Sequence, residues 1–221
     1  MKTILYLGTD PTHFASPWQG ANVIHYPLIQ IIPRSISTPE ITLAYHNLSS
    51  YSHILFTSKY GVQIFFSHLS SLNLSFPDSL ASIAIGQRTA AFLQKEGVIP
   101  SFVAKEESQE GVVALIEGLS HLSSSSILIP KSSLSRPLLF QFLIEKKIHH
   151  TAIDLYDTLF HKPVDQLPPW EQIDLFVFTS PSTVRAFIHF FTLLPPQEKC
   201  FAIGPITQKE ILANRALSKI S

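Results

Sequence analysis

The sequence has little cysteine and little charge. Its 221 residues include one cysteine, Cys200, so no disulfide can form within the chain, which fits a reducing compartment. Only 14% of the residues are charged, and the 16 basic and 16 acidic side chains give a formal net charge of zero. The overall charge therefore gives no support for binding to nucleic acid or to an anionic membrane. Any polyanionic ligand has to be held by local groups.

Several familiar motifs are also absent. No apolar run approaches the ~20 residues of a membrane-spanning helix. The apolar segment after Met1 is short and is followed by no signal-peptide cleavage site, so we expect a soluble protein of the cytoplasm. There is no Gly-x-Gly-x-x-Gly motif, P-loop or Gly-x-Ser-x-Gly motif, which argues against a nucleotide site and against a hydrolase. The ten histidines are scattered, and His149 and His150 are adjacent rather than four residues apart, so we expect no metal site.

What the sequence does contain is a duplicated unit. The stretch Ile54-Leu55-Phe56-Thr57-Ser58 recurs in the second half of the chain as Phe176-Val177-Phe178-Thr179-Ser180. In each copy a short apolar run ends in Thr-Ser and is followed by apolar residues at helical spacing, which predicts a strand, a polar turn and a helix. A second matching pair, Ala84-Ile85-Gly86-Gln87-Arg88-Thr89 and Ala202-Ile203-Gly204-Pro205-Ile206-Thr207, extends the repeat.

Between these units, strands alternate with helices along most of the chain, and 45% hydrophobic residues are enough for substantial cores. This alternation predicts parallel sheets. We expect an α/β protein with two parallel-sheet domains, flavodoxin-like and three-layered, the second inserted in the first. Domain 1 comprises 1–34 and 163–221, domain 2 comprises 38–150, and extended linker strands occupy 28–38 and 151–162. The first crossover, between residues 10 and 20, shows no helical stripe.

Ligands of open α/β sheets bind beyond the carboxyl ends of the strands, where the Gly, Thr and Ser turns fall, and two facing edges would form an interdomain cleft. Helix starts there offer free N–H groups and hydroxyls to an anion. The alternative is that Thr57, Ser58, Thr179 and Ser180 only cap helices. The basic residues that follow strand ends could meet carboxylates or could simply be solvated; they are Lys59, Arg88, Lys131 and Arg136.

Tyr156 lies in the second linker strand between two aspartates, Asp154 and Asp157. Its phenol can donate a hydrogen bond, so it is the best single candidate for chemistry, and the alternative is a packing residue between the domains.

The ordered set of motifs resembles the uroporphyrinogen-III synthase family over nearly the whole chain. The resemblance rests on the Phe-Thr-Ser turn with Val62, Ile85-Gly86-x-x-Thr89 running to Gly97, Ser108-x-x-Gly111 opening a helix, Leu155-Tyr156-x-Thr158, Phe178-Thr179-Ser180-Pro181-Ser182, and Ile203-Gly204-x-x-Thr207.

The resemblance implies two α/β domains joined by a two-stranded linker, no cofactor, and a role in tetrapyrrole synthesis. The implied reaction removes the hydroxyl of hydroxymethylbilane and closes the macrocycle to uroporphyrinogen III with inversion of ring D. It places Tyr156 where loss of the hydroxyl is assisted and Thr207 at the cleft. Together, turns and resemblance give these substrate-binding candidates: Thr57, Ser58, Lys59, Gly86, Arg88, Thr89, Ser108, Lys131, Arg136, Thr179, Ser180, Ser182, Gly204 and Thr207.

The expected partner is hydroxymethylbilane, which carries eight carboxylates, handed over by the deaminase that makes it, and the expected state is a monomer. Two departures from the family pattern, the short first crossover and the end at Ser221 after one helix, predict a smaller first domain. The alternative function is a non-catalytic two-lobed binding protein that closes on a small polycarboxylate.

Overall fold

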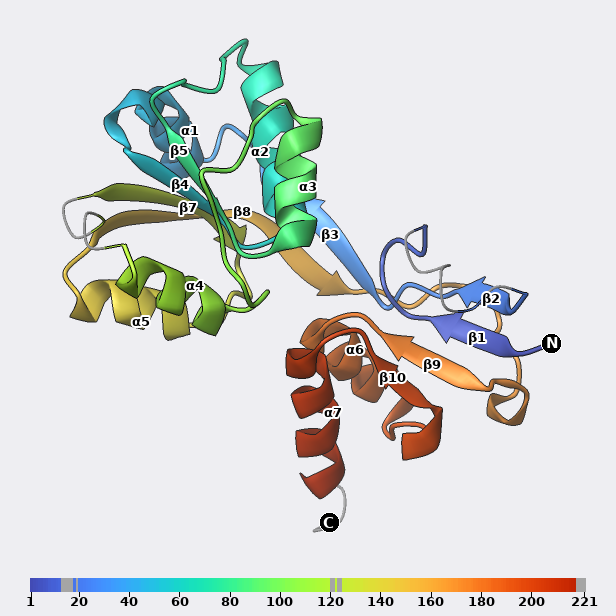
Figure 1. The fold of residues 1–221 in the computed structure, drawn as a ribbon. Coiled ribbons are helices and arrows are strands. Elements are labelled where there is room, and N and C mark those ends of the chain that lie inside the picture. Colours follow the sequence, from blue (N-terminus) through green and yellow to red (C-terminus); the bar gives the residue numbers. More distant parts are fainter. Residues whose placement is uncertain (13–17, 19, 120–121, 123–124, 218–221) are drawn as a thin grey trace. The chain divides into compact units, whose positions relative to one another are not determined.

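The computed structural model describes residues 1–12, 18, 20–119, 122 and 125–217, and it divides into two compact units (Figure 1). Unit 1 comprises Met1–Gln30 and Thr158–Ser221, and unit 2 comprises Ile31–Asp157. The predicted α/β class with two parallel-sheet units is confirmed. Both passages of the chain between the units fall within the expected linker strands, 28–38 and 151–162, while the domain limits themselves stay a prediction.

Unit 1 contains a four-stranded parallel sheet in the order β10-β9-β1-β2. Its strands are β1 (Thr3–Tyr6), β2 (Asn22–His25), β9 (Leu175–Phe178) and β10 (Cys200–Ala202), and its helices are α6 (Pro181–Phe191) and α7 (Pro205–Leu217). Successive residues of β9 face opposite sides of the sheet, as in any strand. Phe176 and Phe178 pack with Phe187 of α6 in one core cluster, whereas Val177 joins a second cluster.

Unit 2 contains a six-stranded sheet in the order β3-β8-β7-β4-β5-β6. The strands are β3 (Ile29–Pro33), β4 (His53–Phe56), β5 (Ala81–Ala84), β6 (Phe102–Val103), β7 (Ser126–Ser132) and β8 (His149–Phe160). The helices are α1 (Pro39–His46), α2 (Lys59–Ser71), α3 (Gln87–Lys95), α4 (Gln109–Glu117) and α5 (Leu138–Glu145). A short 3-10 turn occupies Leu48–Ser50 in this unit, and two others occupy Trp170–Gln172 and Gln197–Lys199 in unit 1.

The unit 2 sheet is covered on both faces. In β4, Ile54 and Phe56 pack in a cluster with residues of α1, α2 and α3, while Leu55 packs in another cluster with residues of α4 and α5. Figure 1 shows these two groups of helices on opposite sides of the sheet. Five strands, β4 to β8, run parallel and stand in the order 3-2-1-4-5 when numbered along the chain. Flavodoxin has the order 2-1-3-4-5, so the two sheets differ in the place of the third strand, which here lies beyond the second.

β2 and β3 are separate strands, because Pro27 lies between them and lacks the N–H that a continued ladder needs. The last helix, α7, begins at Pro205, since proline suits the first position of a helix. The first crossover falls largely on residues 13–17 and 19, outside the described part of the chain.

None of the described helices is both long enough and apolar enough to cross a membrane.

Candidate active site

The site in unit 2 lies where the direction of chain winding changes. β4 has β5 on one side and β7 on the other, so the carboxyl ends of β4 and β7 frame the switch point at which open α/β sheets bind ligands. Thr57 and Ser58 follow β4 directly. The first turn of α2 packs closely on β7, because a Cβ at Gly61 would lie 3.2 Å from the carbonyl oxygen of Pro130.

Ser58 begins α2 as its N-cap. Its Oγ accepts a hydrogen bond from the Gly61 N–H at 3.0 Å, which satisfies one of the free donors of the helix start. The same Oγ lies 2.7 Å from the phenol oxygen of Tyr156. The Lys59 ammonium group lies over the rings of Tyr60 and Phe92, 5.0 and 5.5 Å from their centroids.

Tyr156 reaches Ser58 because β8 contains an irregularity. Lys131 of β7 pairs with Asp154, but Ser132 pairs with Tyr156, so Leu155 is an extra residue with no partner on β7. Such a bulge re-aims the side chains that follow it. In a regular strand Leu155 and Tyr156 would face opposite sides of the sheet. Here both side chains pack in the same core cluster, on the face that α2 covers.

The surroundings of Tyr156 favour the neutral form of its phenol. The residue is 5% exposed, and burial raises the pKa of the phenol above its usual value, with a smaller raising effect from Tyr60. The hydrogen bond with Ser58 acts in the opposite direction on that pKa. The Tyr60 ring lies edge-on to the Tyr156 ring, with 6.2 Å between centroids.

Ion pairs fix the backbone on both sides of Tyr156. Arg34, which follows β3, donates to Asp157 through Nε at 2.9 Å and Nη2 at 2.8 Å, and its Nη1 lies 3.5 Å from Asp154. The hydrogen bonds from Arg34, and then from Ser133, lower the pKa of Asp157 to about 2. Lys131 pairs with Asp154 and its side chain is only 16% exposed, so its charge is directed at that carboxylate.

The remaining unit 2 candidates mostly have structural partners. Ser108 caps α4 by accepting from the Gly111 N–H at 3.0 Å. Arg136 binds both oxygens of Glu110, at 2.8 and 2.7 Å, and this contact lowers the pKa of Glu110 to about 2. A Cβ at Gly86 would lie 2.5 Å from the Glu107 side chain. Two further candidates lie in the first turn of α3, with Arg88 exposed and Thr89 buried.

Unit 1 has a corresponding edge between β1 and β9. Ser180 caps α6 in a capping box, accepting from the Thr183 N–H at 3.3 Å while the Thr183 hydroxyl accepts from the Ser180 N–H at 3.2 Å. Gly8, two residues after the end of β1, lies against Thr179, since a Cβ there would lie 2.5 Å from the threonine methyl. Ser182 is half-buried in α6, Gly204 has open space, and Thr207 is buried.

The duplicated turns repeat in backbone detail. After β4 and β5, the Ile85 N–H donates to the Phe56 carbonyl at 3.0 Å; after β9 and β10, the Ile203 N–H donates to the Phe178 carbonyl at 3.0 Å. The repeat that the sequence predicts is therefore a repeat of hydrogen bonding. The copies differ beyond the cap, because the Ser58 hydroxyl also contacts the Tyr156 phenol, whereas the Thr183 hydroxyl bonds the backbone N–H and carbonyl of Ser180.

Sequence reasoning misses three contributors. Arg34 gives only the signal of a charged residue in a polar linker, and Gly8 only that of a glycine after a strand. Thr183 reads as an ordinary residue of the helix that follows its turn. The available signal is its spacing, because a residue three positions after a serine N-cap can bond the N–H of the cap with its side chain.

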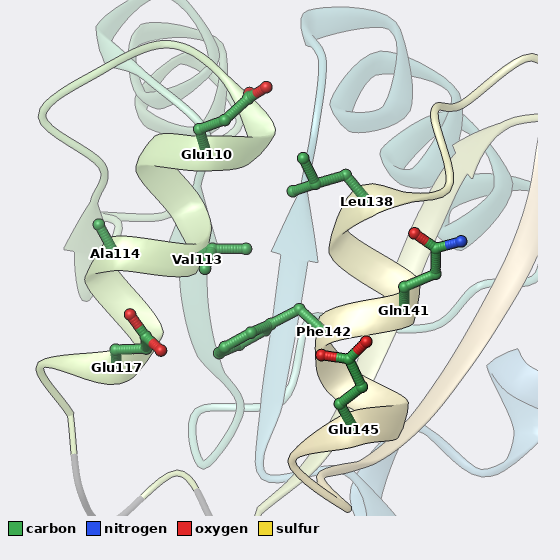
Figure 2. A pocket seen from close by; sticks show the side chains of 8 residues that line it. All are labelled: Glu110, Val113, Ala114, Glu117, Leu138, Gln141, Phe142 and Glu145. Carbon is green, nitrogen blue, oxygen red and sulfur yellow. The ribbon is translucent and has the colours of Figure 1, made fainter.

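Two surface hollows lie away from these candidates. Figure 2 shows the larger, about 480 Å³, between α4 and α5, with Val113, Leu138 and Phe142 pointing into it. The smaller, about 350 Å³, lies in unit 1 beside Tyr26 and Phe191. Within the described ranges, no group of three or more His, Cys, Asp or Glu side chains is placed to hold a metal ion.

Comparison with known proteins identifies relatives of this arrangement. Residues 18–216 match the model of the family described as "Uroporphyrinogen-III synthase HemD". The "Porphyrin biosynthesis protein HemD" of Ruminiclostridium josui is 28% identical over 180 residues, which cover 76% of this chain and 34% of that protein. The match thus spans about a third of the length of this curated relative.

Solved structures share the fold. A mutant uroporphyrinogen III synthase from the extremely thermophilic bacterium Thermus thermophilus matches with a TM-score of 0.66 at 16% identity, over 96% of this chain and 89% of that one. The uroporphyrinogen-III synthetase of Helicobacter pylori matches with a TM-score of 0.60 at 19% identity, over 97% and 90% of the two chains.

Proposed function

Because the chain belongs to the uroporphyrinogen-III synthase family, we propose that it is a cyclising lyase that converts hydroxymethylbilane into uroporphyrinogen III with inversion of ring D. The observation that carries the proposal is the family match over residues 18–216. A phenol held at the switch point of the unit 2 sheet supports it, since that is the edge where a ligand is expected.

The chemistry requires modest assistance from the protein. The bond between the hydroxymethyl carbon and its oxygen breaks, the oxygen leaves as water with one added proton, and the pyrrole nitrogen stabilises the resulting cation. Ring D then attacks that cation through the α-carbon that already bears its methylene bridge, which gives a spiro intermediate. The bond from that carbon to the bridge breaks, the bridge carbon bonds to the other α-carbon of ring D, and that carbon loses one proton as the macrocycle closes. Tyr156 is the proposed donor to the departing hydroxyl, because its phenol is neutral and is held in place. Folding the linear substrate into the reactive conformation is the larger task.

The eight carboxylates of the substrate are proposed to bind the turns at the carboxyl ends of the strands. Backbone N–H groups and hydroxyls at helix starts suit carboxylates without an excess of basic side chains. Arg88 and Lys59 are the proposed cationic contacts of unit 2. Lys131 and Arg136 face Asp154 and Glu110, so we assign them a smaller part in binding.

The deciding experiment uses hydroxymethylbilane and separates the uroporphyrinogen isomers that form. The linear substrate closes spontaneously to isomer I, so the synthase reaction is recognised by isomer III. We expect isomer III to dominate when the purified protein is present. Only isomer I at high protein concentration would remove the proposal, and tight binding of uroporphyrinogen III without any change in isomer ratio would favour the two-lobed binding protein instead.

Tyr156→Phe tests the assigned donor. Removing the phenol oxygen keeps the packing of the ring, so we expect isomer III formation to slow by about 100-fold, at the lower end of what general acids contribute. The free energy of unfolding should fall by only about 1 kcal/mol, the worth of one hydrogen bond. An unchanged rate would remove Tyr156 from the mechanism and leave the family activity intact.

Hand-over of the substrate from the deaminase, a monomeric state, action without a cofactor and a place in the cytoplasm belong to the same proposal. Size measurement in solution, alone and with the deaminase, tests the first two.

A further inference from the structure

We propose that Ser58 is a positioning residue for Tyr156: its hydroxyl donates to the phenol oxygen, so that the hydrogen of the phenol is left for the departing hydroxyl of the substrate. The proposal deepens the proposed function and rests on it. It also changes the role expected for Ser58, from binding a carboxylate of the substrate to orienting the phenol of Tyr156.

The direction of the hydrogen bond follows from counting donors and acceptors. The Ser58 hydroxyl has one hydrogen and two lone pairs, and the Gly61 N–H already uses one lone pair at 3.0 Å. If Tyr156 donated across the 2.7 Å contact, its only hydrogen would be used and it could give none to the substrate. If Ser58 donates, the phenol oxygen accepts and its hydrogen stays available. Only the second arrangement gives a phenol that can assist the leaving group.

The helix start strengthens this arrangement. The Ser58 oxygen accepts from a backbone N–H at the positive end of α2, which makes its own O–H a better donor. A chain of three groups results, from Gly61 N–H through the Ser58 hydroxyl to the Tyr156 phenol.

The phenol is fixed from other directions as well. The Tyr60 ring lies against that of Tyr156, and the Ser133 N–H donates to the Tyr156 carbonyl at 3.1 Å. The irregularity at Leu155, which has no partner on β7, directs Tyr156 toward α2 in the absence of substrate. The Ser58 hydroxyl is therefore the contact that sets the orientation of the O–H bond, while the other contacts set the position of the ring.

Ser180 gives an internal comparison. It caps α6 as Ser58 caps α2, and the Thr183 hydroxyl bonds the backbone N–H and carbonyl of Ser180. The copies share the cap, and only the unit 2 copy adds a phenol. The bond to Tyr156 is thus separable from capping.

The experiment reads the ionisation of Tyr156 directly, without substrate. Incorporated 3-fluorotyrosine lowers the phenol pKa and so the pH needed for the titration, and Tyr156→Phe assigns its ¹⁹F resonance. We expect Ser58→Ala to raise the pKa of Tyr156, because the phenolate loses a donor, and Ser58→Thr to restore it. Ser108→Ala is the matched control, since it removes an N-cap of the same geometry in α4. It should lower the denaturation midpoint to a similar degree and leave the pKa of Tyr156 unchanged.

Kinetics provide the second readout. Ser58→Ala should reduce kcat for isomer III by about 10-fold with KM nearly unchanged, and Ser58→Thr should recover it. In the Tyr156→Phe background, Ser58→Ala should cost almost nothing further, because both changes remove one unit. An unchanged Tyr156 pKa, or a raised KM with unchanged kcat, overturns the proposal. Absence of isomer III with the unaltered protein overturns the proposed function instead. The ionisation measurement needs no substrate, so failure of the Ser58 proposal and failure of the proposed function can be told apart.

Discussion

At the scale of single residues, Thr183 shows how one side chain can satisfy several backbone groups. It is fully buried, its Oγ1 donates to the Ser180 carbonyl at 2.7 Å, and the same oxygen accepts from the N–H groups of Thr179 and Ser180 at 3.2 Å. We expect Thr183→Val, which keeps the shape and removes the hydroxyl, to lower the free energy of unfolding by about 1–3 kcal/mol, because buried polar groups lose their partner.

Thr183→Ser is the control for that change. It keeps the hydroxyl and loses one methyl group, so we expect a smaller cost, about 1 kcal/mol for one buried methyl. Urea denaturation of both variants makes the comparison. If the serine variant proved the less stable of the two, packing of the methyl group would be the main contribution of Thr183.

The sequence predicts residue roles well where position along an element decides them. Capping is the alternative interpretation of Ser58 and Ser180 from their place before apolar periodic segments, and both residues are caps, as is Ser108. It fails where the role depends on a partner distant in the chain. Nothing in the sequence shows that Lys131 faces Asp154 or that Ser58 meets Tyr156, residues separated by 23 and 98 positions.

At the scale of elements, the pair of Arg34 and Asp157 joins the end of β3 to β8. The folded state lowers the pKa of Asp157 from its usual 3.8 to about 2, so the unfolded chain binds more protons between these pH values. Stability from this contact is complete above about pH 4 and is lost as the pH falls toward 2. We expect urea denaturation to show a shallower loss of stability across this range in Asp157→Asn than in the unaltered protein.

Glu110 provides an independent test of the same reasoning. Arg136 lowers the pKa of Glu110 from 4.5 to about 2. Glu110→Gln should therefore also give a smaller loss of unfolding free energy as the pH falls through this range. Both carboxylates are partly exposed, and each effect should be modest and weaker at high salt. The two substitutions should add, because the pairs share no partner. A slope unchanged by either substitution would show that these ion pairs contribute nothing measurable to acid sensitivity.

Secondary structure is predictable here because strands and helices have different periods. The alternation of apolar runs with helical stripes identifies β4, β5, β7, β9 and their helices, and the repeat is visible because the turn residues recur. The separate strand β2 escapes prediction, since its four residues are mostly exposed and lack an apolar run. The regular alternation of 151–159 predicts a strand correctly, yet it cannot show that one residue in that strand has no partner on β7.

At the scale of the whole molecule, unit 2 is a continuous stretch with helices on both faces of its sheet and two core clusters of its own. We expect a fragment of residues 29–160, which keeps β3 and β8 complete, to fold alone and to unfold cooperatively in urea, as domains of this size usually do. Circular dichroism measures the transition.

Phe56→Ala in the same fragment is the control, because the side chain is fully buried and its loss should cost about 3–5 kcal/mol. A fragment that shows no cooperative transition, with or without this change, would mean that unit 2 depends on the rest of the chain for its stability.

Leu155 has no partner on β7, so the direction of Tyr156 depends on how the strands pair as well as on residue identity. If Leu155 instead took the place opposite Ser132, Tyr156 would move one place along the ladder and its phenol would turn toward the opposite face, away from Ser58. A strand of the same residues without the irregularity would then contain the tyrosine and lack the proposed donor. We therefore expect substitutions that move the irregularity along β8 to reduce activity even where Tyr156 is unchanged.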